Sequence, residues 1–401
     1  MTSPRFSNLA AASIAANFAD QMMLALLPLL LVAVGASAGT ISAVVAAHAA
    51  AWLLISLPVG AYADAVSRRR IMTAGAIFIL AGAALGALTL GAEYSPPWLL
   101  ALSAFAIATG VVMLILSVFA LLPKAVEARQ LASANAVLEF GRAAACIACP
   151  IIAALLVTRQ LGALGFALAF AGGLLALIAA WALPVEPRQA GTQVALIAAI
   201  RDGTTFVLDQ PILRAIALCA IAWNSAFFGL TAMFAPYAAT ELGMSIAEIG
   251  QAWSIYGIGL LLGSLAAAPM IRLLPTGFMF IFGPATSCFA VLLMLVGARR
   301  GETWPAALAF FALGFGPMTW LVLQTSVRQI VTPNALLGRV GATMSTAIYG
   351  VRPLGALAAG GTAALLGTHA ALWLSALLFL LSCVFLLLSP AARLRAMPTA
   401  V

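Results

Sequence analysis

Charged residues are scarce in this sequence, at 7% of its 401 residues, and histidine occurs only twice. A soluble globular protein is about one-quarter charged, so this chain lacks the polar surface that water requires. Apolar types make up 64% of the residues. The composition excludes a water-soluble protein and predicts one that lies in a lipid bilayer.

Signatures of ATP use, metal binding and covalent catalysis are missing as well. The sequence has no P-loop, and its histidines and acids lack the spacing of metal ligands. Five cysteines fall in apolar runs, and Cys146 and Cys149 form a CxxC without the context of a redox motif. No basic stripe has a soluble domain to carry it, so a nucleic-acid partner is not expected. We therefore expect no enzyme activity, no cofactor and no metal.

Long apolar runs are what the sequence has in abundance. A helix needs about 20 mainly apolar residues to cross the hydrocarbon of a bilayer. Twelve runs reach that length, and they predict an all-α membrane protein with twelve transmembrane helices. The runs are 8–34, 39–63, 70–91, 98–122, 133–158, 161–183, 213–239, 247–271, 277–298, 303–327, 340–366 and 369–389. The first contains Asp20 and is too long for a cleaved signal peptide, so we expect it to be the first span.

The net charge of +8 is unevenly placed along the chain. With the N-terminus inside, 14 Lys and Arg residues fall on the cytoplasmic side and only Arg159, Arg299 and Arg300 fall outside. This bias obeys the positive-inside rule. We expect both termini in the cytoplasm, and the wealth of arginine and alanine favours a bacterial inner membrane.

A polar stretch near the middle, beginning "PVEPRQAGTQ", divides the spans into two sets of six. The sequence predicts an amphipathic helix at about 194–208, on the cytoplasmic surface. We expect an N-terminal six-helix bundle at 1–183, a linker at 184–212 and a C-terminal six-helix bundle at 213–401.

One numerical match favours an internal duplication of these bundles. Arg142 lies nineteen residues after Pro123, and Arg352 lies nineteen residues after Pro333. Both arginines fall inside the following span. Repeated halves are a common plan among transporters.

The loop after the second span carries a family resemblance. "GAYADAVSRRRIM" resembles the loop G-x-L-a-D-r-x-G-r-[KR] of the major facilitator superfamily at Gly60, Ala63, Asp64, Arg68 and Arg69. It departs where leucine and the second glycine are usual.

The fifth span resembles the antiporter signature of the superfamily, g-x-x-x-G-P-x-x-G-G. The proline is Pro150, and alanine or cysteine replaces each glycine. The fourth span has no charged residue, whereas drug antiporters commonly carry an arginine there. Stretches such as "NFADQMMLALLPLLL" and "NALLGRVGATMSTAIYGVRPLGALAAG" resemble the branch that includes the enterobactin exporter.

The resemblance implies a fold of two pseudo-symmetric bundles and a gate on the cytoplasmic side. In the family, the aspartate of the loop, here Asp64, faces the start of the eleventh helix, near Arg339. The loop arginines, Arg68, Arg69 and Arg70, join a network of charges. The alternative is that these arginines only fix the orientation of the chain in the membrane and take no part in a gate.

Four charged residues lie inside spans: Asp20, Glu139, Arg142 and Arg352. A charge at mid-bilayer costs at least ~2.5–3.5 kcal/mol, so each must face protein or water. Glu139 and Arg142 are three residues apart on one helix and are expected to pair. Their pair either serves function or only fixes helix packing.

Asp20 is the leading candidate for proton coupling, with Glu139 second. Desolvation favours the neutral form of a buried carboxyl, and a nearby arginine favours the charged form. Asn17 and Gln21 share a polar helix face with Asp20. A structural hydrogen bond is the alternative role for Asp20, and His48 in the second span is expected to pack rather than relay protons.

The candidate substrate cavity combines polar, cationic and aromatic residues from several spans. Arg352 is expected either to bind an anionic substrate group or to neutralise Asp20. Packing is the alternative role for most of the set. Its members are Asn17, Gln21, Arg142, Asn224, Phe228, Tyr256, Trp320, Gln324 and Arg352.

These features predict a proton-driven secondary transporter, acting as a monomer, that exports a small amphiphilic organic molecule by alternating access. The resemblance implies a siderophore first and hydrophobic drugs second. The alternatives are an importer or facilitator and, from another class, a non-transporting membrane scaffold.

Overall fold

The computed structural model describes residues 3–62, 66–91, 96–127, 130–184, 196–300, 304–333 and 336–398. Within these ranges the secondary structure is thirteen α-helices and one short 3₁₀ helix. In hydrocarbon every backbone polar group must be satisfied internally, which a helix achieves within its own segment. The expected all-α membrane architecture is therefore confirmed.

The chain divides into two compact units, Met1–Thr192 and Gln193–Val401. The helices of the first unit are α1 (Pro4–Ala33), α2 (Ala38–Tyr62), α3 (Arg68–Gly91), α4 (Pro97–Ala125), α5 (Leu131–Thr158) and α6 (Gly162–Trp181).

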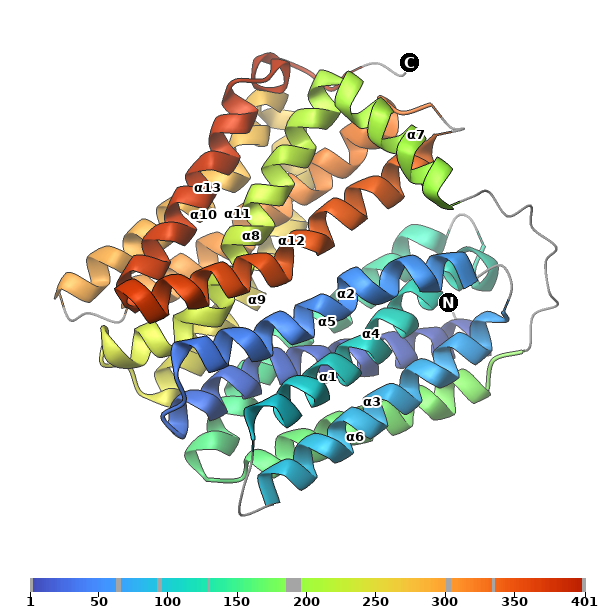
Figure 1. The fold of residues 1–401 in the computed structure, drawn as a ribbon. Helices are drawn as coiled ribbons and strands as arrows, with labels where there is room; N and C mark the ends of the chain where they lie inside the picture. Colours follow the sequence, from blue (N-terminus) through green and yellow to red (C-terminus); the bar gives the residue numbers. More distant parts are fainter. Residues whose placement is uncertain are drawn as a thin grey trace. The chain divides into compact units, whose positions relative to one another are not determined.

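The second unit begins with a short helix and continues with six long ones (Figure 1). They are α7 (Leu196–Asp209), α8 (Pro211–Thr240), α9 (Ile246–Leu273), α10 (Thr276–Arg300), α11 (Trp304–Ile330), α12 (Leu337–Leu366) and α13 (Thr368–Leu387), followed by the 3₁₀ helix Pro390–Arg393.

Eleven helices in the described residues are long and apolar enough to cross a membrane. The sequence predicts twelve, and the difference is α12. This helix has 30 residues but carries Arg339, Arg352, three threonines and one serine, which lower its hydropathy. The length of α12 and its place in the bundle still fit the expected eleventh span. Its polar residues keep its mean hydropathy below that of the other eleven helices.

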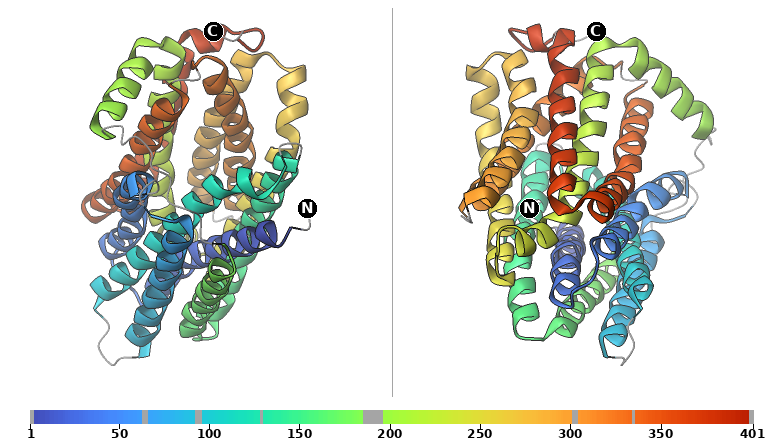
Figure 2. Two further views of the ribbon diagram at one scale, coloured as in Figure 1. Left: turned by 90° about the vertical axis from the view of Figure 1, so that its right-hand side faces the viewer. Right: turned by 60° about the vertical axis from the view of Figure 1, so that its left-hand side comes forward.

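The two units repeat one packing plan. In the first unit the most extensive helix pairs are α1–α5, α1–α6, α2–α4, α3–α4 and α3–α6. In the second they are α8–α12, α8–α13, α9–α11, α10–α11 and α10–α13, which are the same pairs seven helix numbers later. Figure 1 shows α8 and α13 side by side, and Figure 2 shows the first-unit helices from two further directions. The two bundles are pseudo-symmetric, as the fold prediction requires.

Glycine lets equivalent helices cross closely in both units. A Cβ on Gly110 of α4 would lie only 2.2 Å from the carbonyl oxygen of Gly75 in α3. In the second unit a Cβ on Gly283 of α10 would lie 2.9 Å from the carbonyl oxygen of Gly316 in α11. Small residues at such crossings are what membrane helices use to bring backbones together.

Candidate functional site

Each unit places one group of polar side chains near the middle of its helices. Asp20, Gln21 and His48 form the acid–histidine cluster of the first unit. Asn224, Phe228, Tyr349 and Arg352 form the arginine–aromatic cluster of the second. The two clusters are described separately.

Asp20 is the seventeenth residue of the 30-residue α1 and is 8% exposed. One carboxylate oxygen accepts a hydrogen bond of 3.1 Å from the side-chain amide of Gln21. The other lies 3.1 Å from Nε2 of His48 in α2, which is 3% exposed. This second contact is at ion-pair distance but is not aligned as a hydrogen bond: Asp20 Oδ1 and both ring nitrogens of His48 lack a hydrogen-bond partner among the described residues.

The α1–α2 hairpin explains why these two side chains meet. Asp20 lies thirteen residues before the end of α1, and His48 lies ten residues after the start of α2. At 1.5 Å per residue both are about 15–20 Å from the turn that joins the helices. Because the two residues lie at similar distances from the turn between consecutive antiparallel spans, their contact could have been predicted from the sequence. The sequence analysis instead expected His48 to pack.

Helix α5 passes close to the same part of α1. The sulfur of Cys149 lies 3.6 Å from the carbonyl oxygen of Phe18, one turn before Gln21. Cys146 is also buried, and both thiols are free. The CxxC thus packs against α1 beside the acid–histidine cluster, as small buried residues do.

Glu139 and Arg142 form the expected pair along α5. The carboxylate oxygen of Glu139 accepts a hydrogen bond of 2.8 Å from Nε of Arg142 and lies at an ion-pair distance of 2.7 Å from Nη2. The side chains are 46% and 30% exposed, respectively. The side chain of Glu139 is more accessible than that of Asp20, so Asp20 is the more deeply buried acid of the two.

Asn17 bonds along its own helix rather than toward Asp20. Its side-chain amide donates to the carbonyl oxygen of Ser13 at 2.8 Å and lies 3.4 Å from the Ser13 hydroxyl. Of the three residues on the expected polar face, only Asp20 and Gln21 contact each other in the described hydrogen bonds. A short amide side chain on a helix readily reaches the carbonyl one turn back.

Arg352 lies at the centre of the arginine–aromatic cluster. It is the sixteenth of 30 residues in α12, and its Nε donates to the side-chain oxygen of Asn224 at 3.0 Å. Asn224 is buried in α8 and donates in turn to the carbonyl of Ala220 at 2.9 Å. The guanidinium carbon lies 4.9 Å from the ring centroid of Phe228 and 4.6 Å from that of Tyr349.

A run of aromatic rings extends from this cluster. Phe228 meets Phe227 edge to face at 5.9 Å, and Phe227 stacks on Trp223 at 4.9 Å with an interplanar angle of 11°. Tyr256 of α9 lies 5.5 Å from Phe227. Trp223 is a neighbour of Phe227 that the sequence analysis did not name. Their spacing of four residues on α8 was the signal.

Trp320 and Gln324 are buried, and their expected cavity role stays a prediction. Trp320 is 9% exposed and belongs to the hydrophobic core of the second unit, where it packs over Gly283 at the α10–α11 crossing. Gln324, 5% exposed, donates to the hydroxyl of Thr325 at 3.0 Å. Trp320 is buried because its side chain fills the space that Gly283 leaves.

The residues of the expected gate are only partly described. Asp64 lies outside the described residues, so its contact with the start of α12 stays a prediction. Gly60 belongs to α2, and Arg68, Arg69 and Arg70 form the first turn of α3.

Arg339, at the start of α12, has a partner that the sequence analysis did not name. Its Nη1 donates to the carboxylate of Asp202 in α7 at 2.9 Å. Gly203, beside Asp202, brings the two helices together, since a Cβ there would lie 2.5 Å from the carbonyl oxygen of Arg339. The amphipathic helix thus packs on α12 (Figure 1).

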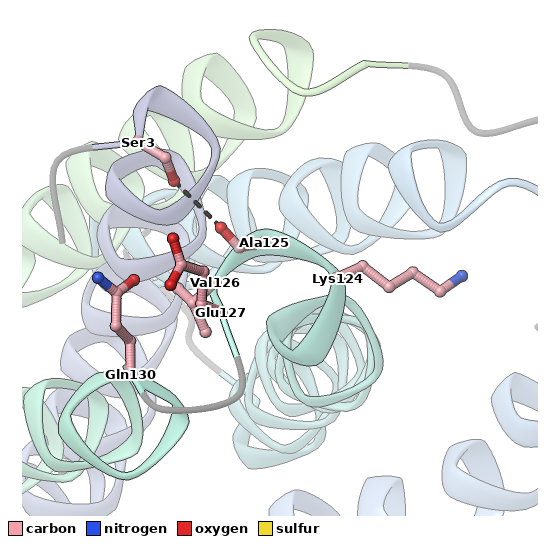
Figure 3. A pocket seen from close by; sticks show the side chains of 6 residues that line it. All are labelled: Ser3, Lys124, Ala125, Val126, Glu127 and Gln130. Carbon is pink, nitrogen blue, oxygen red and sulfur yellow. Dashed lines mark hydrogen bonds between the residues drawn. The ribbon is translucent and has the colours of Figure 1, made fainter.

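A surface pocket of about 350 Å³ lies at the helix ends of the first unit. Figure 3 shows the side chain of Lys124 directed away from those of Glu127 and Gln130, and the Ser3 hydroxyl donating to the carbonyl of Ala125 at 3.1 Å. The pocket joins the start of α1 to the end of α4. It contains none of the mid-helix residues, and we do not assign it to transport.

Comparison with known proteins agrees with the fold. Solved structures of similar fold include a POT family transporter in complex with 5-aminolevulinic acid (14% identity, 96% of each chain covered, TM-score 0.78). They also include a bacterial homolog of the human lysosomal transporter Spinster (14% identity, 98% of each chain, TM-score 0.75) and a D-xylose–proton symporter (14% identity, 95% of this chain and 96% of that one, TM-score 0.72). No curated protein matches the chain by sequence.

The family comparison covers almost the whole chain. Residues 1–399 match the family described as transmembrane secretion effector. With its major facilitator fold, this multi-pass membrane protein therefore belongs to the transmembrane secretion effector family of major facilitator transporters.

Proposed function

We propose that the protein is a proton-coupled exporter of a small amphiphilic organic molecule, working by alternating access in a bacterial inner membrane with both termini in the cytoplasm. The family description supports outward transport. The sequence resemblance to the branch that includes the enterobactin exporter favours a siderophore-like substrate, and a drug-like one is the second candidate.

The observation that carries the coupling is the contact between Asp20 and His48. The side chains of His48 and Asp20, which are 3% and 11% exposed, lie 3.1 Å apart at mid-helix depth. A buried carboxyl in a membrane helix needs a partner or a proton, because an uncompensated charge there is costly. The ring of His48 supplies a partner whose own charge can change.

In this mechanism Asp20 carries the transported proton and His48 stabilises its charged form. Protonation of the pair from outside neutralises the carboxylate, and release of the proton to the inside restores it. In the structure the side-chain amide of Gln21 donates to the second carboxylate oxygen of Asp20. Glu139, which is half-exposed and paired with Arg142, is the second candidate for the proton site.

The test compares the bacterium that makes the wild-type chain with strains that carry Asp20→Asn or His48→Gln, all starved of iron. Mass spectrometry of medium and cell extract is expected to show one metal-chelating compound building up inside the Asp20→Asn cells and falling in the medium. His48→Gln should shift the same compound in the same direction.

Thr109→Val is the matched control. Thr109 is buried in α4 of the same unit and its hydroxyl has no hydrogen-bond partner in the described residues, so the change removes a polar group without breaking a contact. It should behave as wild type. Identical profiles for all strains at equal protein levels would exclude siderophore export through Asp20. A compound that instead remains in the medium of the Asp20→Asn strain would favour an importer.

A further inference from the structure

We propose that an exposed group of arginines at one end of the second unit binds the headgroup of an anionic phospholipid. The group consists of Arg272, Arg393 and Arg395 and is called the arginine group below. The site lies on the outside of the bundle, so the inference goes beyond the proposed export and depends neither on the substrate nor on proton coupling.

The segment that follows α13 is held firmly against the bundle. The backbone amide of Gly277, at the start of α10, donates to the carbonyl oxygen of Leu394 at 2.7 Å. Ala391 is fully buried in the core of the second unit, and Leu394 packs against the same core. Arg393 and Arg395 therefore have fixed positions at the start of α10.

The third arginine comes from the helix that precedes α10. Arg272 lies in the last turn of α9, and only Leu274 and Pro275 separate α9 from α10. The short turn keeps Arg272 at the end of the unit where the segment after α13 meets Gly277. Three positive charges from two parts of the sequence are thus brought to one end of the bundle.

The charges of the arginine group are not cancelled by acids. All three side chains are exposed, and none forms a hydrogen bond or ion pair with another residue in the part of the chain that the structure describes. The acids at this end are both in α7. Asp202 is paired with Arg339 at 2.9 Å, and Asp209 forms no ion pair with a described residue.

Exposed apolar side chains lie beside the arginine group. Leu273, next to Arg272, is 81% exposed, Phe278 at the start of α10 is 50% exposed, and Leu388 at the end of α13 is 83% exposed. In a bilayer such side chains lie in hydrocarbon, while an arginine beside them reaches the headgroups.

A phospholipid matches both halves of this surface. Its phosphate can accept charge-assisted hydrogen bonds from guanidinium groups, and its acyl chains can cover the exposed leucines and phenylalanine. A soluble anion or an acidic protein surface would match the arginines alone. An anionic lipid is favoured over a zwitterionic one by about fivefold for each basic side chain near the surface.

Photo-crosslinking of lipids tests the site where it is proposed. The full-length chain in neutral micelles is mixed with phosphatidylglycerol that carries a diazirine on one acyl chain, or with phosphatidylcholine labelled in the same way. Labelled residues are mapped by mass spectrometry. Phosphatidylglycerol is expected to label Leu273, Phe278 and Leu388 at least about tenfold more strongly than phosphatidylcholine does.

Variants connect the labelling to the charges. The double variant Arg393→Gln, Arg395→Gln should lower labelling by phosphatidylglycerol about tenfold or more, and Arg272→Gln should lower it about fivefold. The double variant Arg393→Lys, Arg395→Lys keeps both charges and should retain most of the labelling. If the double glutamine variant fails to fold, Arg272→Gln decides.

Arg159→Gln is the matched control, because it removes an equal, exposed charge at the C-terminal end of α5 in the first unit. It should leave labelling of the three apolar residues unchanged. Equal labelling by the two lipids, or full labelling of the glutamine variants, would overturn the inference and leave the arginines with the role of orienting the chain. Loss of labelling on addition of glycerophosphoglycerol, which lacks acyl chains, at the concentration of the lipid would also overturn it, since the site would then bind a soluble anion.

Discussion

At the scale of residues, burial distinguishes the intramembrane charges. Asp20 and His48 are almost fully enclosed, whereas Glu139 and Arg142 are 46% and 30% exposed. Breaking a buried pair leaves an uncompensated group, whereas an accessible pair is typically worth little. We therefore expect loss of the Asp20–His48 contact to destabilise the protein more than loss of the Glu139–Arg142 pair.

We expect a weak coupling between Glu139 and Arg142. A double-mutant cycle of Glu139→Gln and Arg142→Gln, measured by unfolding in mixed micelles, should give about 0.3–0.5 kcal/mol, the scale of an accessible pair along a helix. A coupling above about 1.5 kcal/mol would mean that the pair is structurally dominant.

We expect a larger effect of His48→Gln on stability, since Asp20 then loses its close partner. The unfolding free energy should fall by about 1–3 kcal/mol. Thr109→Val in the same assay should leave it near the wild-type value. Equal values for the two variants would contradict a stabilising contact between Asp20 and His48.

At the scale of elements, helix crossings depend on single glycines. The backbones of α3 and α4 approach so closely at Gly75 and Gly110 that even a methyl group would meet a carbonyl oxygen. The linker helix α7 packs on α12 in the same manner at Gly203. These positions decide where one helix lies on the next.

The same substitution should have opposite effects at two helical glycines. Gly110→Ala is expected to lower the unfolding free energy by about 1–3 kcal/mol through overpacking. A Cβ on Gly361 in α12 would meet no atom within 4 Å, so Gly361→Ala should be neutral or stabilising by up to about 1 kcal/mol. Similar losses at both sites would refute the crossing argument.

The contact of α7 with α12 is open to a direct test. Gly203→Ala should push α7 away and weaken the ion pair between Asp202 and Arg339, so amide hydrogen exchange in α7 should become faster. Gly338→Ala, next to Arg339 but with open space around its Cβ, should leave exchange unchanged. Slow exchange in both variants would show that α7 is held elsewhere.

At the scale of the whole molecule, two bundles of one plan have acquired different chemistry. The first carries Asp20 and His48 at mid-helix, and the second carries Arg352, Asn224 and a run of aromatic rings. Our proposed function assigns proton binding to the first unit, which forms one of two compact units of the chain.

We expect each unit to keep its helices when the chain is cut between them. A protease site inserted within 185–195 and cleaved after purification should leave the circular dichroism at 222 nm unchanged, because the extensive helix pairs lie within each unit. A large loss of helicity on cleavage would show that the units do not fold independently. Uncut protein with the same insertion is the control.

The sequence by itself determined the membrane class, the all-α fold and the family. These follow from run length, charge scarcity and loop motifs, all of which are local properties of the chain. It also predicted the pair of Glu139 and Arg142, because residues three apart on a helix share a face.

Only the tertiary structure decided which distant side chains meet. His48 reaches Asp20, Arg352 reaches Asn224 and Arg339 reaches Asp202 because separate helices cross at set depths and rotations, which small residues fix. Trp320 is buried for the same reason, since its ring covers Gly283. Helical periodicity gives the face of a residue on its own helix, but the neighbour of that face depends on how the bundle is packed.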